Sequence, residues 1–441
     1  MKIPSRSIRK ELGSIVLALL LLPLVTGCLL RDAHRQISQL DSGCVIAGTA
    51  VGDSDQPGPY IVVAWTDLDA EASLRPVDHF VMDEGGPWVF ALEPGRYRVL
   101  AFRDIQGDLS YRPDNPLKEY RQGEALDCSS GTQLNGIDMV IHDQDRPRRA
   151  MTMNLTRERF QQGHIDYAAI ASLGQATAYG ELTTLSHARF AEDNARDSLW
   201  RPLDFFLAGN PGIYFLEPYD AAREPVLFVH GINGSPRVFT ELIGQLDSSR
   251  FQPWLFYYPS GVGLNENTRY LTNIMLELEI RHGVRRFHVV GHSMGGLVAM
   301  AFLQNRHDRG APAEAGVFLP LSAPWGGHAA AGRAVDASPL VMPVWRDMAP
   351  GSDFLANLFG VDNGARLPDS VTMHLLFSYA GGDYLTWGST DGVISLASLL
   401  KPEAQDLAQS VYGFDTTHIG ILSHQAAIER INQLLAEAAG Q

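Results

Sequence analysis

The chain has 441 residues, enough for two or three domains that each bury their own core. Its hydrophobic content of 45% and aromatic content of 9% are those of a globular protein and exclude a wholly disordered chain. The net charge of −15 argues against a nucleic-acid partner, because such proteins present a clustered basic surface. One short basic cluster, Arg146, Arg148 and Arg149, falls in a predicted linker.

The first 27 residues have the order of an export signal. Basic residues at positions 2 to 10 precede an apolar run over 15–25, and the small residues Thr26 and Gly27 stand just before Cys28. As a helix the run would cross only about half of a ~30 Å hydrocarbon core, which argues against a transmembrane anchor. The sequence "VTGC" resembles a bacterial lipobox. The resemblance implies removal of residues 1–27, a lipid on Cys28 and attachment to a membrane of the bacterial cell envelope, with Leu29 favouring the outer membrane. The alternative is an ordinary secretory signal that ends at a cysteine.

Residues 43–142 are predicted to form short strands. The segments "YIVVAWTDL", "WVFAL", "RYRVLAF" and "GIDMVIHD" are rich in β-branched and aromatic residues and are separated by Gly, Pro and Asp clusters. We therefore expect a small all-β sandwich. The segment "FALEPGRYRVLAFRDIQGD" resembles the strand–turn–strand of carboxypeptidase-regulatory and transthyretin-like sandwiches.

Cysteine usage fits an exported sandwich. If Cys28 carries lipid, Cys44 and Cys128 remain as an even pair for an oxidising compartment. They bracket the β-rich segment, so a disulfide between its first and last strands is expected, with two buried free thiols as the alternative. In the same region Asp104, Gln106 and Asp108 have the alternate spacing of calcium ligands, but a solvated turn is the favoured interpretation, and we predict no metal site.

A linker and a helical connector are predicted over 143–212, followed by a second domain over 213–441. From residue 213 onward, apolar runs over 225–231, 254–259, 287–291, 316–324 and 374–382 have the length of strands buried on both faces. Between the first two, Ser235 and Pro236 open a helix with one apolar face. Repeated β–α alternation predicts a mostly parallel sheet with helices on both sides.

The stretch "FHVVGHSMGGLVAM" (287–300) places Ser293 between a strand and a helix. Small residues two before and two after the serine allow the sharp strand–turn–helix of a nucleophile elbow. A glycine-rich turn with no chemical role is the alternative. Upstream, "FVHGINGSP" follows an earlier strand, where the backbone N–H of Ile232 could join that of Met294 as an oxyanion hole. His230 in that loop is interpreted as an organiser of the loop.

The remaining members of a catalytic triad should follow in the order Ser, acid, His. Asp391 stands in the glycine-flanked loop "GSTDGVIS", and His418 follows in "FDTTHIG". Asp383 is the alternative acid and His424 the alternative base. In this assignment His418 takes the proton of Ser293, and Asp391 fixes the imidazole tautomer.

The motifs "PVLFVHGINGSP", "YYPSG", "VVGHSMGG", "SAPWGG" and "STDGVIS" resemble the α/β-hydrolase superfamily of lipases and esterases, in particular bacterial lipases and the GPI-deacylase-like branch. The resemblance covers about 213–436. It implies an α/β-hydrolase fold, ester hydrolysis, a covalent acyl-enzyme on Ser293 and no cofactor.

The apolar stretch at about 325–370 is predicted to form a cap or lid that offers an acyl chain a trough, with ordinary packing on the core as the alternative. We therefore expect a lipid-anchored serine hydrolase of carboxylic esters with an apolar acyl group. An acyltransferase with the same triad, or a catalytically silent surface lipoprotein that acts as a binding scaffold, are the other hypotheses. The sequence identifies no protein partner for the sandwich.

Overall fold

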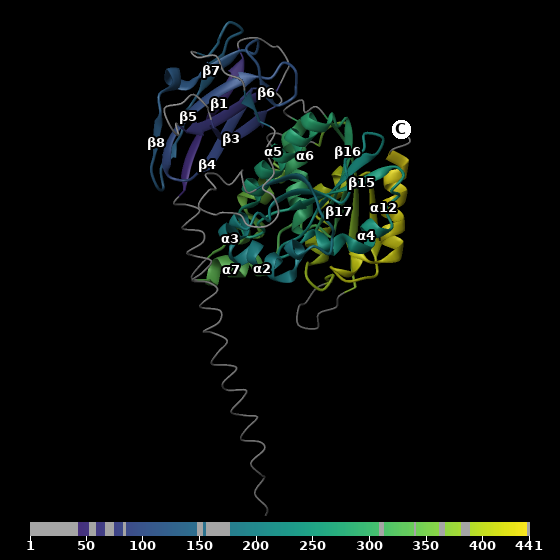
Figure 1. Ribbon diagram of the computed structural model, residues 1–441. Coiled ribbons are helices and arrows are strands. Elements are labelled where there is room, and N and C mark those ends of the chain that lie inside the picture. The colour runs from purple at the N-terminus through teal and green to yellow at the C-terminus, as the bar shows by residue number, and fades with distance from the viewer. Residues whose placement is uncertain are drawn as a thin grey trace, which may run out of the picture.

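The computed structural model describes residues 43–52, 59–66, 75–82, 85–147, 153–155, 177–307, 313–338, 341–360, 367–380 and 389–438. The predicted export signal and Cys28 lie outside the described residues. An all-β domain and an α/β domain lie side by side (Figure 1).

The all-β domain, formed by the first ten strands, confirms the predicted fold class of the N-terminal region. One sheet has the order β10–β1–β4 with β9 beside β1, and the other has the order β3–β2–β5–β7 with β8 beside β5. The strands are β1 (Cys44–Gly52), β2 (Tyr60–Thr66), β3 (Arg75–Met82), β4 (Gly86–Leu92), β5 (Gly95–Arg103), β6 (Ser110–Tyr111), β7 (Leu117–Glu119), β8 (Leu126–Cys128), β9 (Gln133–Leu134) and β10 (Met139–Ile141), with β11 (Met153–Asn154) paired to β6 and a 3₁₀ turn η1 (Tyr120–Gly123) after β7.

A disulfide joins Cys44 to Cys128, whose Cα atoms are 5.6 Å apart. It links β1 of one sheet to β8 of the other. The pairing was expected, but β8 is not the last strand, because β9 and β10 follow it. The bond therefore crosses the core of the sandwich, where both cysteines are buried.

The α/β domain contains an eight-stranded sheet of order β12–β13–β15–β14–β16–β17–β18–β19. Its strands are β12 (Ala178–Leu182), β13 (Gly212–Phe215), β14 (Glu224–Val229), β15 (Phe251–Tyr257), β16 (Arg286–His292), β17 (Glu314–Leu321), β18 (Thr372–Ser378) and β19 (Ser410–Phe414). All neighbours are parallel except β13 and β15. The mostly parallel sheet is as predicted, but it begins at β12, inside the segment expected to be a connector.

The helices of this domain are α2 (Glu192–Trp200), α3 (Pro202–Leu207), α4 (Thr240–Gly244), α5 (Leu264–His282), α6 (Met294–His307), α7 (Ala329–Ala337), α8 (Pro343–Met348), α9 (Asp353–Leu358), α10 (Leu396–Leu399), α11 (Pro402–Leu407) and α12 (Gln425–Ala438), with 3₁₀ turns η4 (Ala188–Phe190), η5 (Pro236–Phe239) and η6 (Gly420–Leu422). The helix predicted after Ser235 therefore starts as 3₁₀. Ser235 does not cap it, because its hydroxyl donates to the Phe190 carbonyl at 2.9 Å instead.

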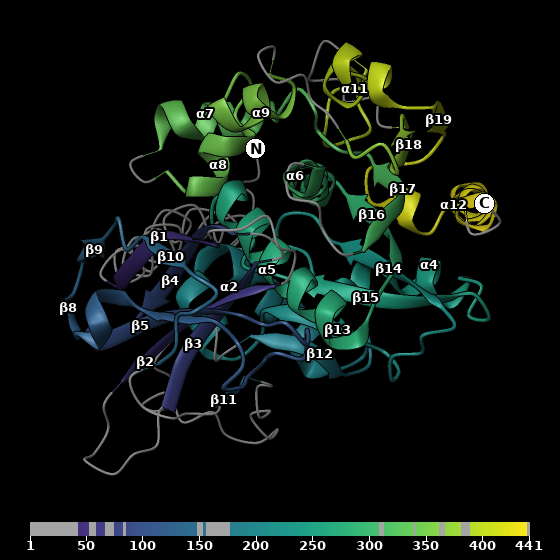
Figure 2. The same ribbon diagram turned by 90° about the horizontal axis from the view of Figure 1, so that it is seen from above.

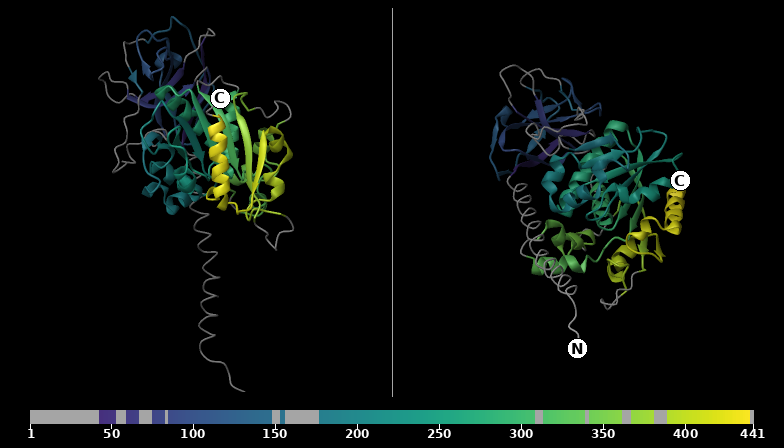
Figure 3. Two further views of the ribbon diagram at one scale, coloured as in Figure 1. Left: turned by 90° about the vertical axis from the view of Figure 1, so that its right-hand side faces the viewer. Right: turned by 60° about the horizontal axis from the view of Figure 1, so that its bottom comes forward.

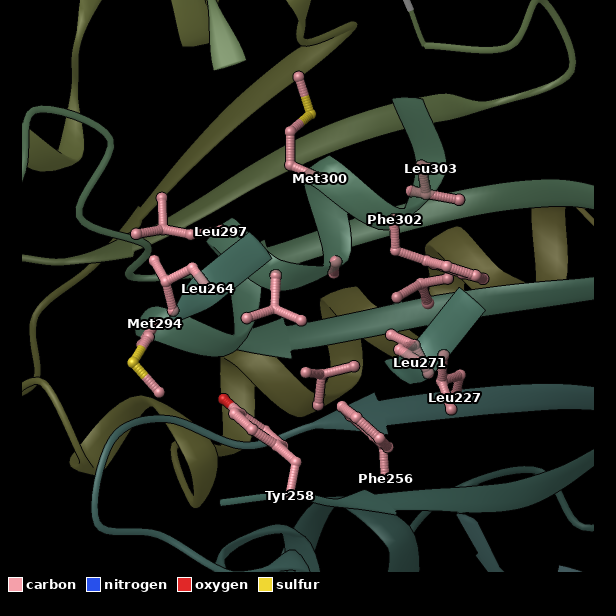
Figure 4. Packing of buried hydrophobic residues seen from close by; sticks show 14 of the residues in the cluster. Leu227, Phe256, Tyr258, Leu264, Leu271, Met294, Leu297, Met300, Phe302 and Leu303 are labelled. Carbon is pink, nitrogen blue, oxygen red and sulfur yellow. The ribbon is translucent and has the colours of Figure 1, made fainter. Parts of the chain in front are cut away.

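The two faces of the large sheet are covered by different helices (Figure 2). Helices α5 and α6 bury one face in a core that includes Leu227, Phe256 and Leu297, and Figure 4 shows these side chains as members of that buried cluster. On the other face α4 and α12 pack through residues such as Leu242 and Ile431. Figure 3 shows α12, in yellow, lying across that face.

Helix α5 also holds the all-β domain in place. Side chains of β2 alternate, so that Val62 faces the core of the sandwich while Val63 faces outward. The outward set packs against Leu276 and Ile280 of α5. Strand β2 is therefore buried on both sides, which explains its continuously apolar sequence.

The segment predicted as a cap forms helices α7, α8 and α9, which lie together in Figure 2. Most of its apolar side chains are buried in the core of the domain rather than exposed over the sheet, including Met342, Val344, Phe354 and Leu358. Such burial fits both a cap packed on the domain and ordinary packing on the core, so the cap stays a prediction. Within the described residues, no helix combines the length and apolarity that a bilayer span requires.

Candidate active site

Ser293 lies in the turn between β16 and α6 with φ of 53°, in the left-handed region that side chains avoid. Its amide donates to the Leu321 carbonyl at 2.8 Å, which fixes the turn against β17. The surrounding glycines are required sterically. A Cβ on Gly295 would stand 2.1 Å from the Val229 carbonyl oxygen, and one on Gly291 would stand 2.8 Å from the Gly295 oxygen. The motif therefore forms the strained strand–turn–helix of a nucleophile elbow.

The structure brings the three predicted triad residues together. His418 Nε2 lies 2.9 Å from Ser293 Oγ, and His418 Nδ1 lies 2.6 Å from Asp391 Oδ2. All three side chains are buried, with Asp391 fully so. Since an ionised carboxylate only accepts hydrogen bonds, Nδ1 carries the proton and Nε2 is left to accept from the serine hydroxyl. This is the tautomer that a general base needs.

The Asp391 carboxylate is fully hydrogen-bonded on both oxygens. Its Oδ1 accepts from the backbone N–H groups of Val393 at 3.0 Å and Ile394 at 2.7 Å. Its Oδ2 accepts from His418 and from the Ser378 hydroxyl, the latter at 3.1 Å. Burial by itself would raise the pKa of this carboxyl, but the bonds from His418 and the two amides outweigh it and hold the pKa below its ordinary value.

The two predicted oxyanion donors flank the nucleophile. Met294 is the first residue of α6, so its N–H lacks an intrahelical acceptor. The N–H of Ile232 likewise has no acceptor in the part of the chain that the structure describes. Its neighbours are held, since Asn233 N–H donates to Ser260 Oγ at 3.1 Å and Gly234 N–H to the Gly231 carbonyl at 3.2 Å. A Cβ on Gly231 would come within 3.0 Å of Ser293 Cβ, so this loop closely approaches the serine.

His230 organises the same loop, as its sequence position suggested. Its ring stacks on Tyr258 with centroids 4.4 Å apart, and its Nδ1 donates to the Gly231 carbonyl at 2.8 Å. The Tyr258 hydroxyl donates to the His230 carbonyl at 2.6 Å. Burial lowers the pKa of His230 to about 4, so the ring is neutral at pH 7.

His292, directly before the nucleophile, belongs to the site and was missed by the sequence reasoning. Its Nε2 donates to the His418 carbonyl at 3.0 Å, and the two rings lie 5.0 Å apart. Burial lowers the pKa of His292 to about 3, with the neighbouring His418 adding to the effect. The ring therefore ties the loop of the base to the elbow. A histidine inside the motif was a signal, but its partner is a backbone atom that sequence does not reveal.

The alternative residues take other places. His424 precedes α12 and packs against Phe414 with ring centroids 5.7 Å apart, and Asp383 lies outside the described residues. The turn considered for calcium is not simply solvated. Asp104 is buried, and its carboxylate accepts from the N–H groups of Gly107 at 3.1 Å and Leu109 at 2.7 Å. No cluster of metal-ligating side chains occurs within the described ranges.

A family model agrees with this architecture. Residues 224–310 match the family model described as the alpha/beta hydrolase fold. No curated protein matches the chain.

Similar solved structures include three enzymes. The mature lipase BlEst2 of Bacillus licheniformis is 18% identical with a TM-score of 0.41, over 51% of this chain and 97% of the lipase. Lipase B of Aspergillus fumigatus is 14% identical with a TM-score of 0.38, over 51% of this chain and 56% of its own. A thermophilic esterase of Thermogutta terrifontis is 16% identical with a TM-score of 0.33, over 52% and 94%. The family match and the strand order together confirm the predicted fold, and we conclude that the domain carrying Ser293 is an alpha/beta hydrolase domain.

Proposed function

We propose that the protein is a serine hydrolase that cleaves carboxylic esters through an acyl-enzyme on Ser293. The observation that carries the proposal is the continuous hydrogen-bonded line from Ser293 Oγ to His418 Nε2 at 2.9 Å and from His418 Nδ1 to Asp391 Oδ2 at 2.6 Å. Nucleophile, base and orienting acid thus stand within hydrogen-bond reach of one another, as acyl transfer requires.

The chemical steps follow from this arrangement. Ser293 Oγ attacks the ester carbonyl carbon while its proton passes to His418 Nε2, and the carbonyl oxygen becomes an oxyanion facing the N–H groups of Ile232 and Met294. Collapse of this intermediate breaks the bond to the alcohol oxygen, which leaves with the proton from His418. Water then repeats the sequence, releasing the carboxylic acid and restoring Ser293. Asp391 stays ionised throughout and stabilises the imidazolium.

An apolar acyl group is the substrate class that the rim of the site supports. Val393 is 52% exposed and Ile419 is 59% exposed, and they stand two residues from Asp391 and next to His418, respectively. Large apolar side chains exposed on the loops of a catalytic centre favour apolar substrates.

The proposal is tested by turnover of p-nitrophenyl esters from acetate to palmitate. Wild-type protein should hydrolyse them with a preference for longer chains, and Ser293→Ala should lose the activity while keeping its thermal unfolding midpoint. Undiminished turnover in Ser293→Ala would remove the assignment. Acyl transfer to an added alcohol in place of hydrolysis would favour an acyltransferase, and an inert wild-type protein would favour the scaffold.

We also propose that the enzyme is held at a membrane of the bacterial envelope by a lipid on Cys28. The support is the order of the segment before it, basic residues, apolar run and "VTGC". In a bacterial host, the wild-type protein should partition into detergent and Cys28→Ser should not. Equal partitioning of the two would contradict the lipid anchor, and separation of inner from outer membranes would show which membrane holds it.

A further inference from the structure

Two buried serines stand behind Asp391. Ser378 ends β18, and its Oγ lies 3.1 Å from Asp391 Oδ2. Ser322 follows β17 directly, and its Oγ lies 2.8 Å from Ser378 Oγ. The two side chains are 0% and 1% exposed, so no solvent competes for these bonds. Together they extend the line of hydrogen bonds beyond the acid into the interior.

The direction of each bond is fixed by chemistry. An ionised carboxylate has no proton to give, so the Ser378 hydroxyl donates to Asp391. That hydroxyl has a single proton, so the Ser322 hydroxyl must donate to Ser378. Ser322 Oγ in turn accepts from the Ser378 N–H at 3.1 Å. The chain of donors therefore runs from β17 to β18 and ends on the charge of Asp391.

The backbone of Ser322 gives an independent indication that its hydroxyl matters. Ser322 has φ of 49°, and its N–H donates to the Leu376 carbonyl at 2.8 Å. Glycine would adopt this conformation without strain, whereas a side chain is strained there. Within the described part of the α/β domain, the other residues with positive φ that are not glycine are Asn233 and Ser293, in the oxyanion loop and at the nucleophile. Backbone strain of this kind is retained mainly at functional sites, where the side chain has a role that glycine could not fill.

We propose that Ser378 and Ser322 are positioning residues that orient Asp391 and hold its charge, an inference that rests on the proposed function. The two backbone amides on Oδ1 leave Oδ2 as the oxygen that His418 and Ser378 share. A donor on the far side of Oδ2 holds that oxygen against His418 Nδ1. It also withdraws part of the charge, which keeps the buried carboxyl ionised and moderates the basicity of His418.

The test measures kcat/KM for a p-nitrophenyl ester as a function of pH. Ser378→Ala should lower kcat/KM by about 10- to 100-fold, the range for a hydrogen bond to a charged group, mainly through kcat. The acid limb of its profile should move to higher pH, because a carboxylate with fewer donors stabilises the imidazolium more. Ser322→Ala should give a smaller change in the same direction, and the double variant should match Ser378→Ala, since the serines act in series.

Ser322→Gly distinguishes the effect of losing the hydroxyl from the effect of backbone strain, because glycine removes the hydroxyl and also relieves the strain. It should keep or raise the thermal midpoint, because the strain is relieved, yet lose as much activity as Ser322→Ala. Ser410→Ala is the matched control. Its hydroxyl lies 2.6 Å from His374 Nδ1, between β18 and the neighbouring strand β19 and without a bond to Asp391, so its profile should match wild type.

Three results would overturn the proposal. Ser378→Ala and Ser322→Ala could keep kcat/KM within twofold of wild type with an unmoved acid limb. Ser322→Gly could keep full activity where Ser322→Ala loses it. If the wild-type protein and Ser410→Ala are both inactive, the proposed function fails, and the positioning role of Ser378 and Ser322 fails with it. If the wild-type protein is active and the Ser378 and Ser322 variants are equally active, only the positioning role fails.

Discussion

Replacing Asp391 by asparagine tests the most specific consequence of the geometry. Oδ1 receives two backbone N–H groups, from Val393 and Ile394, so an amide at this position must place its oxygen there. Its NH₂ group then faces His418 Nδ1 in place of the carboxylate oxygen that now lies 2.6 Å away. Since an amide nitrogen donates, Nδ1 must become the acceptor and the ring proton moves to Nε2.

The consequence is a base in the wrong tautomer. A protonated Nε2 cannot accept from Ser293 Oγ, although it stays 2.9 Å away and the fold is unchanged. In Ser-His-Asp enzymes this change costs on the order of 10⁴-fold in kcat. At 1.36 kcal/mol per tenfold, that corresponds to about 5 kcal/mol of lost transition-state stabilisation.

The assay is pre-steady-state and steady-state hydrolysis of a p-nitrophenyl ester by wild type, Asp391→Asn and Asp415→Asn. Asp415 is exposed and stands three residues before His418, so its change controls for the loss of one carboxylate nearby. Its rate should match wild type, and all three proteins should unfold at similar temperatures. A rate for Asp391→Asn within tenfold of wild type would refute the tautomer argument and move the acid role to Asp383.

Three further outcomes follow from packing and charge. Gly295→Ala should abolish activity and lower the thermal midpoint, because its Cβ would stand 2.1 Å from a backbone oxygen. The control Gly244→Ala, whose Cβ would have no atom within 4 Å, should leave activity and thermal midpoint unchanged. Equal behaviour of the two variants would contradict the elbow geometry. Glu279→Gln should lower the free energy of unfolding in urea by about 3 to 5 kcal/mol, because Arg306 would lose its buried carboxylate partner at 2.8 Å. A decrease below about 1 kcal/mol would contradict this role of the ion pair. Burial holds the pKa of His292 near 3, below its unfolded value of 6.5. Between these pH values the unfolded state binds the extra proton, so the free energy of unfolding should fall as the pH is lowered. His292→Gln should weaken this dependence of stability on pH, and an unchanged dependence would contradict the argument.

The candidate triad residues could be found in the sequence because each lies in a local pattern of turn and glycine residues. Ser293, Asp391 and His418 each stand in a short motif, and their chain order is that of the fold. The positioning residues could not be predicted in the same way. Ser322 and Ser378 meet only because β17 and β18 are neighbours in a particular register, and two serines 56 positions apart carry no such signal.

One other difference also has a physical cause. Strand β12 was missed because its centre is Gly180 and its sequence "AYGEL" lacks a continuous apolar run, yet it pairs with β13 at the edge of the sheet. The cap over the active site stays a prediction, because apolar residues suit both a lid and a core. Met342 and Val344 are fully buried in the core, and a cap closed on the domain would bury them in the same way.

The central claim is that Ser293 is an activated nucleophile, and covalent labelling tests it most directly. A fluorophosphonate probe should form one adduct, which peptide mass spectrometry should place on Ser293, and prior incubation with an ester substrate should slow its formation. Ser293→Ala should remain unlabelled. An unlabelled wild-type protein, or an adduct that persists in Ser293→Ala, would contradict the account.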